Sequence, residues 1–231
     1  CHDVGHGPLS HAFDKFLFER GNRFYKHEYR SVTLLRNIVA KYGINIPQVQ
    51  VEAACELIHP VNFDLPIFMY QIIANHVDDV DVDKLDYLKR DSIFTGIGYN
   101  IDISRFFEYA RVINNQLCYS FKSMQYTIHH MFTVRHQLHA QVYQHAVVRA
   151  IEYMYSDIMK LIGDSLEFGD DLNKFAKLTD DIFTKEFMIG NPITITKPLF
   201  VKAMNQLNRI EIRDLYYCLG EYPIDHGICK H

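Results

Sequence analysis

Apolar residues recur every three or four positions along much of the chain, which is the spacing of the buried face of a helix. Val32, Leu35 and Val39 form one such series, and Gly43 ends it, as glycine commonly does after a helix. Pro47 suits the first turn of the helix that follows. The pattern predicts helices over residues 32–42, 47–58, 67–75, 82–91, 103–112, 125–162, 172–187 and 197–207.

Two short stretches follow a different pattern. After the turn signal Asn114–Asn115, apolar and polar residues alternate from 117 to 122, which predicts a short β-ribbon. Residues 193–196 predict a brief strand, and residues 213–218 a last turn. The sequence shows no internal repeat and no clear linker. We therefore expect one all-α, mainly helical domain with a short β-ribbon and a small mixed C-terminal part.

Composition narrows the class of protein. The chain has 231 residues, of which 48% are hydrophobic, so it can bury a sizeable core. A net charge of −4 without a basic stripe argues against a dedicated nucleic-acid groove. No apolar run reaches the roughly 18 residues that span a bilayer, so we expect no membrane partner. Five cysteines without close pairing favour reduced thiols and a cytoplasmic or nuclear location.

The first fourteen residues hold the densest candidate chemistry. His2 and Asp3 are adjacent, and on a helix neighbouring side chains lie about 100° apart, so both can reach one metal ion. His6 would share the helical face of His2. Gly5 and Gly7 would let the backbone approach a bound group. Imidazole and carboxylate together suit a divalent cation, and the alternative is an ordinary polar turn rich in histidine.

Two later segments repeat one spacing. Asp83, Tyr87 and Asp91 lie at i, i+4 and i+8 of a predicted helix, with Lys84 beside them. A second series with the same spacing comes later in the long predicted helix, with Gln144 next to its last member: Arg135, His139 and Tyr143. Each residue taken alone fits a solvated helix face or a hydrogen-bonded core position. Together with the aspartate cluster, a functional role for them is the favoured interpretation.

Residues 1–14, 81–91 and 143–145 closely resemble the HD-domain deoxynucleoside triphosphate triphosphohydrolases that carry a SAM domain before the HD domain. The resemblance runs in order from Cys1 to about Tyr222 and is looser after Ile162. It implies a single HD phosphohydrolase domain over 1–231, with a catalytic core at 1–162 and a C-terminal helical extension at 163–231. The family's first metal-binding histidine precedes the His–Asp pair, so we expect an N-terminally truncated HD domain.

The resemblance also implies an activity and a set of metal and catalytic residues. Members split a deoxynucleoside triphosphate (dNTP) into deoxynucleoside and triphosphate, using one or two divalent ions, here Fe, Mn, Mg, Zn or Ni. The implied metal ligands are His2, Asp3 and Asp83. His11 would protonate the leaving 5′-oxygen with Asp14 orienting it at i+3, and His6 and His27 would face the phosphates. For His27 alone, a histidine that merely precedes a helix is an equal alternative.

Further residues match the family's substrate and regulatory positions. Lys84, Tyr87 and Arg135 would hold the triphosphate, and Asp91 and Gln144 the sugar 3′-hydroxyl. Tyr143 would pack on the deoxyribose where a 2′-hydroxyl would clash, with His139 lining the same pocket. Asp102, Arg105 and His145 match or lie near an allosteric nucleotide site. The resemblance implies a homo-oligomer, a dimer or a tetramer that depends on bound nucleotide.

Two other functions stay open at this stage. An HD phosphohydrolase for another phosphate ester would not need the cationic clamp of Lys84, Tyr87 and Arg135. A catalytically inactive nucleotide-binding or oligomerising module would not need His11 and Asp14. The products formed from dGTP with Mg²⁺ or Mn²⁺ distinguish the three hypotheses.

Overall fold

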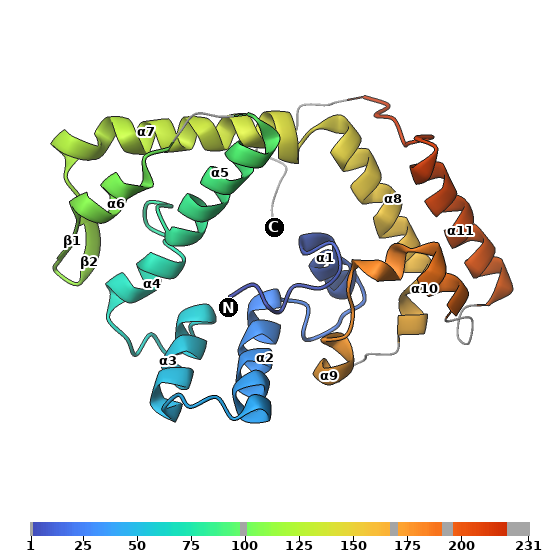
Figure 1. Cartoon of the computed structure of the whole chain (residues 1–231), viewed down its shortest axis with the longest axis horizontal. Helices are drawn as coiled ribbons and strands as arrows, with labels where there is room; N and C mark the ends of the chain where they lie inside the picture. Colours follow the sequence, from blue (N-terminus) through green and yellow to red (C-terminus); the bar gives the residue numbers. More distant parts are fainter. Residues whose placement is uncertain (1, 98–100, 167–170, 191–195, 221–231) are drawn as a thin grey trace.

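The computed structural model describes residues 2–97, 101–166, 171–190 and 196–220. Helices dominate these ranges, as the periodicity predicts, and one antiparallel ribbon interrupts them (Figure 1). The elements of the first half are α1 (His11–Glu19), α2 (His27–Tyr42), α3 (Gln48–Ile58), α4 (Ile67–Ile73), α5 (Val82–Thr95), α6 (Ile103–Tyr109), β1 (Ala110–Ile113) and β2 (Gln116–Tyr119). Those of the second half are α7 (Phe121–Leu138), the π-helix η1 (His139–Tyr143), α8 (Ala146–Ile162), the 3₁₀ turn η2 (Gly163–Leu166), α9 (Leu172–Phe175), the 3₁₀ turn η3 (Asp180–Phe183), α10 (Lys185–Gly190) and α11 (Lys197–Glu211).

Three hydrophobic clusters hold the described residues together, and the smallest of them joins α2 to α3. In the first, Phe13 and Phe16 of α1 pack with Ile158 and Met159 of α8 and with the C-terminal helices. The second joins α5, α6 and α7 through residues such as Leu88 and Met131. Figure 1 shows α5 lying beneath α7, α11 alongside α8, and α1 near the middle of the molecule. The segment that leads into α1 and the start of α5 therefore belong to different clusters.

The ribbon lies earlier in the chain than predicted, because its first strand, β1, precedes the Asn114–Asn115 turn. Asn114 and Asn115 both have positive φ, 50° and 64°, which is typical of a tight hairpin turn. β1 and β2 pair across this turn, with Arg111 opposite Cys118. The helix predicted over 103–112 therefore ends at Tyr109, because the next four residues pair as β1. The predicted alternation beyond residue 119 is wrong, since α7 begins at residue 121.

The long helix predicted over 125–162 is two helices. α7 widens into the π-turn η1, and the chain then bends before α8. His145 stands at this bend with extended backbone (ψ 135°), and its ring nitrogen Nδ1 accepts a hydrogen bond from the Val147 N–H at 3.3 Å. That bond satisfies one of the free N–H groups at the start of α8. No proline or glycine marks the break, so the pattern of apolar residues could not reveal it.

The helix predicted over 172–187 is also wrong, because it is broken into α9, η3 and α10. The Asp171 carboxylate accepts hydrogen bonds from the N–H groups of Asn173 and Lys174, and the Thr179 hydroxyl accepts one from Asp181. Such local side-chain bonds compete with continuous helix. The strand predicted at 193–196 lies outside the described residues except for its last residue, which immediately precedes α11.

Candidate metal and active site

Residues 2–5 form a turn before α1, not the helix expected from the His2–His6 spacing. The His6 N–H donates to the Asp3 carbonyl at 3.0 Å and closes this turn. Ser31 of α2 holds it from beneath: its hydroxyl accepts from the Gly5 N–H at 2.8 Å and donates to the His2 carbonyl. The turn is therefore fixed by buried contacts to α2, and His2 and His6 do not share a helical face.

Gly5 is required by close packing on α2. A Cβ at this position would come within 2.3 Å of the His27 carbonyl oxygen and 2.4 Å of the Ser31 nitrogen. A Cβ at Gly7 would likewise meet the Phe13 ring at 2.4 Å. Both glycines therefore let the turn approach protein atoms, whereas the sequence suggested that they make room for a bound group.

His2, Asp3 and Asp83 come together although Asp83 lies on α5, far along the chain. One potential ligand atom from each residue lies within 4.8 Å of the other two. His2 Nε2 is 3.1 Å from Asp3 Oδ2 and 3.3 Å from Asp83 Oδ1. Asp83 reaches this position because it lies in the first turn of α5, whose N-cap residue Asp81 accepts a hydrogen bond from the Lys84 N–H at 2.8 Å.

These three residues fit a divalent cation. Two ligand atoms bound about 2.1 Å from one ion and at right angles to each other lie about 3 Å apart, close to the separations of His2 from the two carboxylates. Two carboxylate oxygens and one imidazole nitrogen suit Fe, Mn, Mg, Zn or Ni. All three side chains are partly exposed, so water or substrate can reach the same point.

Three histidine rings pack next to this group. His6 stacks on His27 with 3.9 Å between ring centroids, and the His11 ring lies edge-on to His6 at 4.9 Å. Asp3 links the two groups, because its Oδ1 is 3.4 Å from His6 Nε2 while its other oxygen faces His2. Burial and the neighbouring His27 lower the pKa of His6 to about 4. His6 is therefore neutral near pH 7.

Asp14 bonds to His27 and Arg30, whereas the i+3 spacing had suggested His11. Its Oδ2 is 2.7 Å from His27 Nδ1 and 4.0 Å from His11 Nδ1, and its Oδ1 accepts a hydrogen bond from Arg30. The His11 side chain is 80% exposed. Burial alone would raise the pKa of Asp14, but the hydrogen bonds to His27 and Arg30 lower it. Burial alone would lower the pKa of His27, yet the hydrogen bond with Asp14 raises it overall.

Cationic side chains gather on the neighbouring faces of α5 and α7. Burial raises the pKa of Tyr87, and a hydrogen bond with Arg135 together with the charge of Lys84 opposes this rise. Arg135 Nε is buried and has no hydrogen-bond partner among the described residues. Lys84 Nζ lies 3.2 Å from Asp81 Oδ2, so its charge is already partly neutralised.

Aromatic side chains lie where the facing surfaces of α5 and α7 end. The Tyr143 hydroxyl donates a hydrogen bond to Asp91 Oδ2, which connects η1 to α5. The Tyr143 ring lies 6.3 Å from the ring of Tyr87 and 5.0 Å from that of His139. The two series with i, i+4, i+8 spacing thus meet along their length.

Known relatives align with almost the whole length of this chain. No family model matches the chain. It is 32% identical to the deoxynucleoside triphosphate triphosphohydrolase SAMHD1 homolog of Dictyostelium discoideum and 32% identical to SAMHD1 of Homo sapiens, each over 96% of the chain. It is 33% identical, over 98% of the chain, to an HD domain-containing protein of Acanthamoeba polyphaga mimivirus. The chain belongs to the HD-domain family. It spans 43%, 41% and 52% of the length of these relatives.

The remaining predicted residues of this HD domain belong neither to the His2–Asp3–Asp83 group nor to the histidine cluster. Gln144 is exposed, next to the bend after η1. Arg105 donates to the Thr127 hydroxyl and the Ser123 carbonyl, so it holds α6 against α7. Asp102 is exposed at the start of α6 and accepts from the Ser104 hydroxyl. Their contacts, like the cap formed by His145, have a structural explanation, and their regulatory role stays a prediction.

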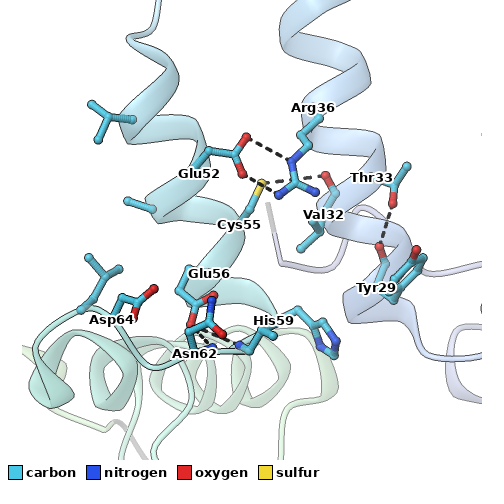
Figure 2. Close-up of a pocket in the computed structure, with 14 residues that line it drawn as sticks. Tyr29, Val32, Thr33, Arg36, Glu52, Cys55, Glu56, His59, Asn62 and Asp64 are labelled. Carbon is cyan, nitrogen blue, oxygen red and sulfur yellow. Dashed lines mark hydrogen bonds and ion pairs between the residues drawn. The ribbon is translucent and has the colours of Figure 1, made fainter.

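A separate groove of about 610 Å³ lies between α2 and α3 (Figure 2). Figure 2 shows Arg36 and Glu52 facing each other across it, with their closest atoms 2.6 Å apart. Glu56 Oε1 accepts hydrogen bonds from three consecutive backbone N–H groups, those of residues 61–63. Arg36 and Glu52 are therefore paired with each other, and Glu56 is bound by backbone groups. Its lining, within the described part of the HD domain, includes none of the predicted site residues.

The pattern of residues did not reveal Arg30 and Ser31, which support the site from α2. Both are buried, at 1% and 0% exposure, within a stretch where a single arginine would ordinarily face solvent. The available signal was spacing, because Arg30 follows His27 by three positions and so shares its helical face.

No helix of the described ranges is long and apolar enough to cross a membrane.

Proposed function

We propose that this HD domain hydrolyses dNTPs to deoxynucleoside and inorganic triphosphate, with one or two divalent metal ions. The observation that carries this proposal is the convergence of His2, Asp3 and Asp83 from distant parts of the chain into one group of possible ligands. The Dictyostelium and human relatives add support, since both are named deoxynucleoside triphosphate triphosphohydrolases.

His2, Asp3 and Asp83 would hold a metal ion. A bound divalent ion would lower the pKa of a water molecule and offset charge on the attacked phosphate. Asp3 borders the histidine cluster as well as this group. The reacting phosphate would therefore sit between the two groups, where the three histidine side chains can contact it.

The histidines would donate the proton to the leaving group and contact the phosphate oxygens. We assign His11 as the acid that protonates the leaving 5′-oxygen, because it is the most exposed of the three and borders the cluster. His6, neutral near pH 7, would donate a hydrogen bond to a phosphate oxygen. His27 would face the phosphates with its Nε2, since its Nδ1 is engaged by Asp14. Asp14 would thus orient His27 directly and affect His11 only through space.

The faces of α5 and α7 would bind the rest of the substrate. Lys84, Tyr87 and Arg135 would hold the triphosphate, because a polyanion requires local cations in an otherwise acidic chain. Its oxygens would replace part of the contact between Lys84 and Asp81. Such an exchange is possible because Lys84 is not fully enclosed.

The aromatic end would bind the sugar. Asp91 would accept from the 3′-hydroxyl, with Gln144 and His139 at the same end of the pocket. The Tyr143 ring would occupy the space of a 2′-hydroxyl and so exclude ribonucleotides. Its hydroxyl stays protonated, since burial and the hydrogen bond to Asp91 raise the pKa of Tyr143.

Regulation and assembly belong to the same proposal. The chain would act as a homo-oligomer, a dimer or a nucleotide-dependent tetramer, in a reducing cytoplasmic or nuclear compartment. Asp102, Arg105 and His145 would contribute to a second nucleotide site. Sedimentation with and without dGTP would test the assembly, and an unchanged sedimentation coefficient would count against the nucleotide-dependent tetramer.

Product analysis tests the activity directly. The full-length protein is incubated with dGTP and Mg²⁺ or Mn²⁺, and deoxyguanosine with intact triphosphate is the expected result. Free phosphate or pyrophosphate without triphosphate would favour an HD phosphohydrolase of another specificity. The absence of every product under both metals would favour a binding module.

A further inference from the structure

Arg30 is an arginine buried beneath the candidate active site. Its guanidinium is 1% exposed and makes four hydrogen bonds. Nε donates to the Gly5 carbonyl at 2.8 Å, and Nη1 donates to the carbonyls of Phe24 and Tyr25 at 2.5 and 2.7 Å. Nη2 donates to Asp14 Oδ1. One side chain of α2 thus connects the His–Asp turn, the segment before α2 and the carboxylate on α1.

The bond to Asp14 determines where this carboxylate can point. Asp14 has two oxygens; Arg30 engages Oδ1, and His27 Nδ1 lies 2.7 Å from Oδ2. The carboxylate cannot turn to His11, 4.0 Å away, without giving up one of these partners. Because His27 in turn stacks on His6 at 3.9 Å, the orientation of Asp14 extends to the ring that borders Asp3.

A buried arginine without a carboxylate partner would be costly, and so would a buried carboxylate without its arginine. Arg30 lies 5.0 Å from the centre of the Phe175 ring and 6.0 Å from that of Phe13, so apolar groups surround its plane. In such surroundings a charge-assisted hydrogen bond has a fixed direction, because no water molecule competes for it. The guanidinium fork therefore constrains Asp14 in angle as well as in distance.

We infer that Arg30 is a positioning residue for the histidine cluster: it acts through Asp14 to hold His27 in the orientation and tautomer that direct Nε2 toward the substrate. This inference rests on the proposed function. It assigns Arg30 no contact with substrate or metal. A purely structural role, in which Arg30 only ties Phe24 and Tyr25 to the turn, predicts no special dependence on Asp14.

Kinetics of the R30M and R30K variants of the full-length protein distinguish these roles. R30M should lower kcat for dGTP by about 10–100-fold with KM within about threefold, the usual effect of losing a residue that supports a catalytic group. R30K keeps the charge without the fork and should lose less. R36M is the matched control, because it removes an arginine–carboxylate pair from the same helix outside the site. Its kcat should equal that of the wild type.

A double-mutant cycle shows whether Arg30 acts through Asp14. If it does, D14N and D14N/R30M should have the same kcat, because the second substitution removes a constraint on a carboxylate that is already gone. Independent effects that multiply in the double variant would overturn the inference. An unchanged kcat in R30M, in a folded protein with an active wild type, would overturn it as well.

Side-chain ¹⁵N NMR of the histidines tests the same inference without turnover. In the wild type at a pH where the imidazole is neutral, His27 should be held with its proton on Nδ1, toward Asp14. In R30K, which should fold even if R30M does not, the His27 nitrogens should shift toward values averaged over both tautomers. Identical His27 signals in wild type and variant would overturn the inference. A wild type that makes no triphosphate refutes only the proposed function.

Discussion

The hydroxyl of Tyr143 donates a hydrogen bond to the carboxylate of Asp91, and this bond connects the π-turn η1 to the middle of α5. The π-turn itself widens the helix by one residue immediately before the chain bends into α8. Such an insertion changes the direction of the side chains that follow α7, and here Tyr143 at the end of η1 faces Asp91. Since both residues are proposed to contact the sugar, their contact gives the pocket one defined wall.

Replacing Tyr143 tests this wall. Y143A removes the ring and should let ribonucleotides in, so that the ratio of kcat/KM for dGTP over GTP falls by at least about tenfold, the size expected for losing one steric or packing contact. Y143F keeps the ring and loses only the hydrogen bond to Asp91. This control should keep the discrimination and lose about 1 kcal/mol of stability in denaturant unfolding. An unchanged ratio in Y143A would show that another group excludes the 2′-hydroxyl.

Replacing Asp83 tests the metal group. D83A removes one of the three convergent ligands, so metal content measured by mass spectrometry after dialysis should drop and triphosphate release should cease. D86A is a suitable comparison, because Asp86 lies on the exposed side of the same helix and its ion-pair partner among the described residues is Arg90. It should keep wild-type metal content and turnover. Full metal occupancy in D83A would remove Asp83 from the ligand set.

The sequence was sufficient for the fold class and for the helical spacing of the two series on α5 and along α7 and η1. Helical spacing needs only local information, and the series Asp83–Tyr87–Asp91 and Arg135–His139–Tyr143 do lie on facing helices. Their functional roles stay predictions. The predicted end of α2 and start of α3 also depended only on local signals. Gly43 has the left-handed conformation (φ 58°) that ends α2, and Pro47 directly precedes α3.

What the sequence could not reveal depends on contacts between distant segments. Asp14 has His11 three positions away, yet it bonds to His27 and Arg30, because α2 packs against the turn and brings both side chains to the carboxylate. The His–Asp turn is not helical, since Ser31 occupies its backbone groups. Likewise, the bend at His145 has no glycine or proline to announce it.

Adding one methyl group at Gly5 should disturb the site without touching a ligand. In G5A the new Cβ would overlap the His27 carbonyl and the Ser31 nitrogen, both backbone atoms that cannot rotate away. We expect a loss of about 1–3 kcal/mol in the free energy of unfolding and weaker metal binding, because the His2–Asp3 turn must move off α2. G190A is the control, since among the described residues nothing beyond its own helix backbone and chain neighbours lies within 4 Å of the Cβ it would add. Equal melting temperatures for G5A and wild type would contradict this account of the turn.

Removing Arg135 should weaken binding of the triphosphate more than it slows the reaction. Its guanidinium contacts Tyr87 while Nε has no partner among the described residues, so a phosphate oxygen could complete its hydrogen bonds. A charge-assisted bond of about 1.5–3 kcal/mol corresponds to a rise in KM of about 10–150-fold for R135A. R209A serves as the comparison, because Arg209 pairs with Asp214 near the end of α11, on an element that carries none of the proposed site residues, and its loss should leave KM unchanged. Inhibition by the product deoxyguanosine should be the same in R135A and wild type, since the nucleoside lacks phosphate. A drop in kcat at unchanged KM would instead place Arg135 in the chemical step.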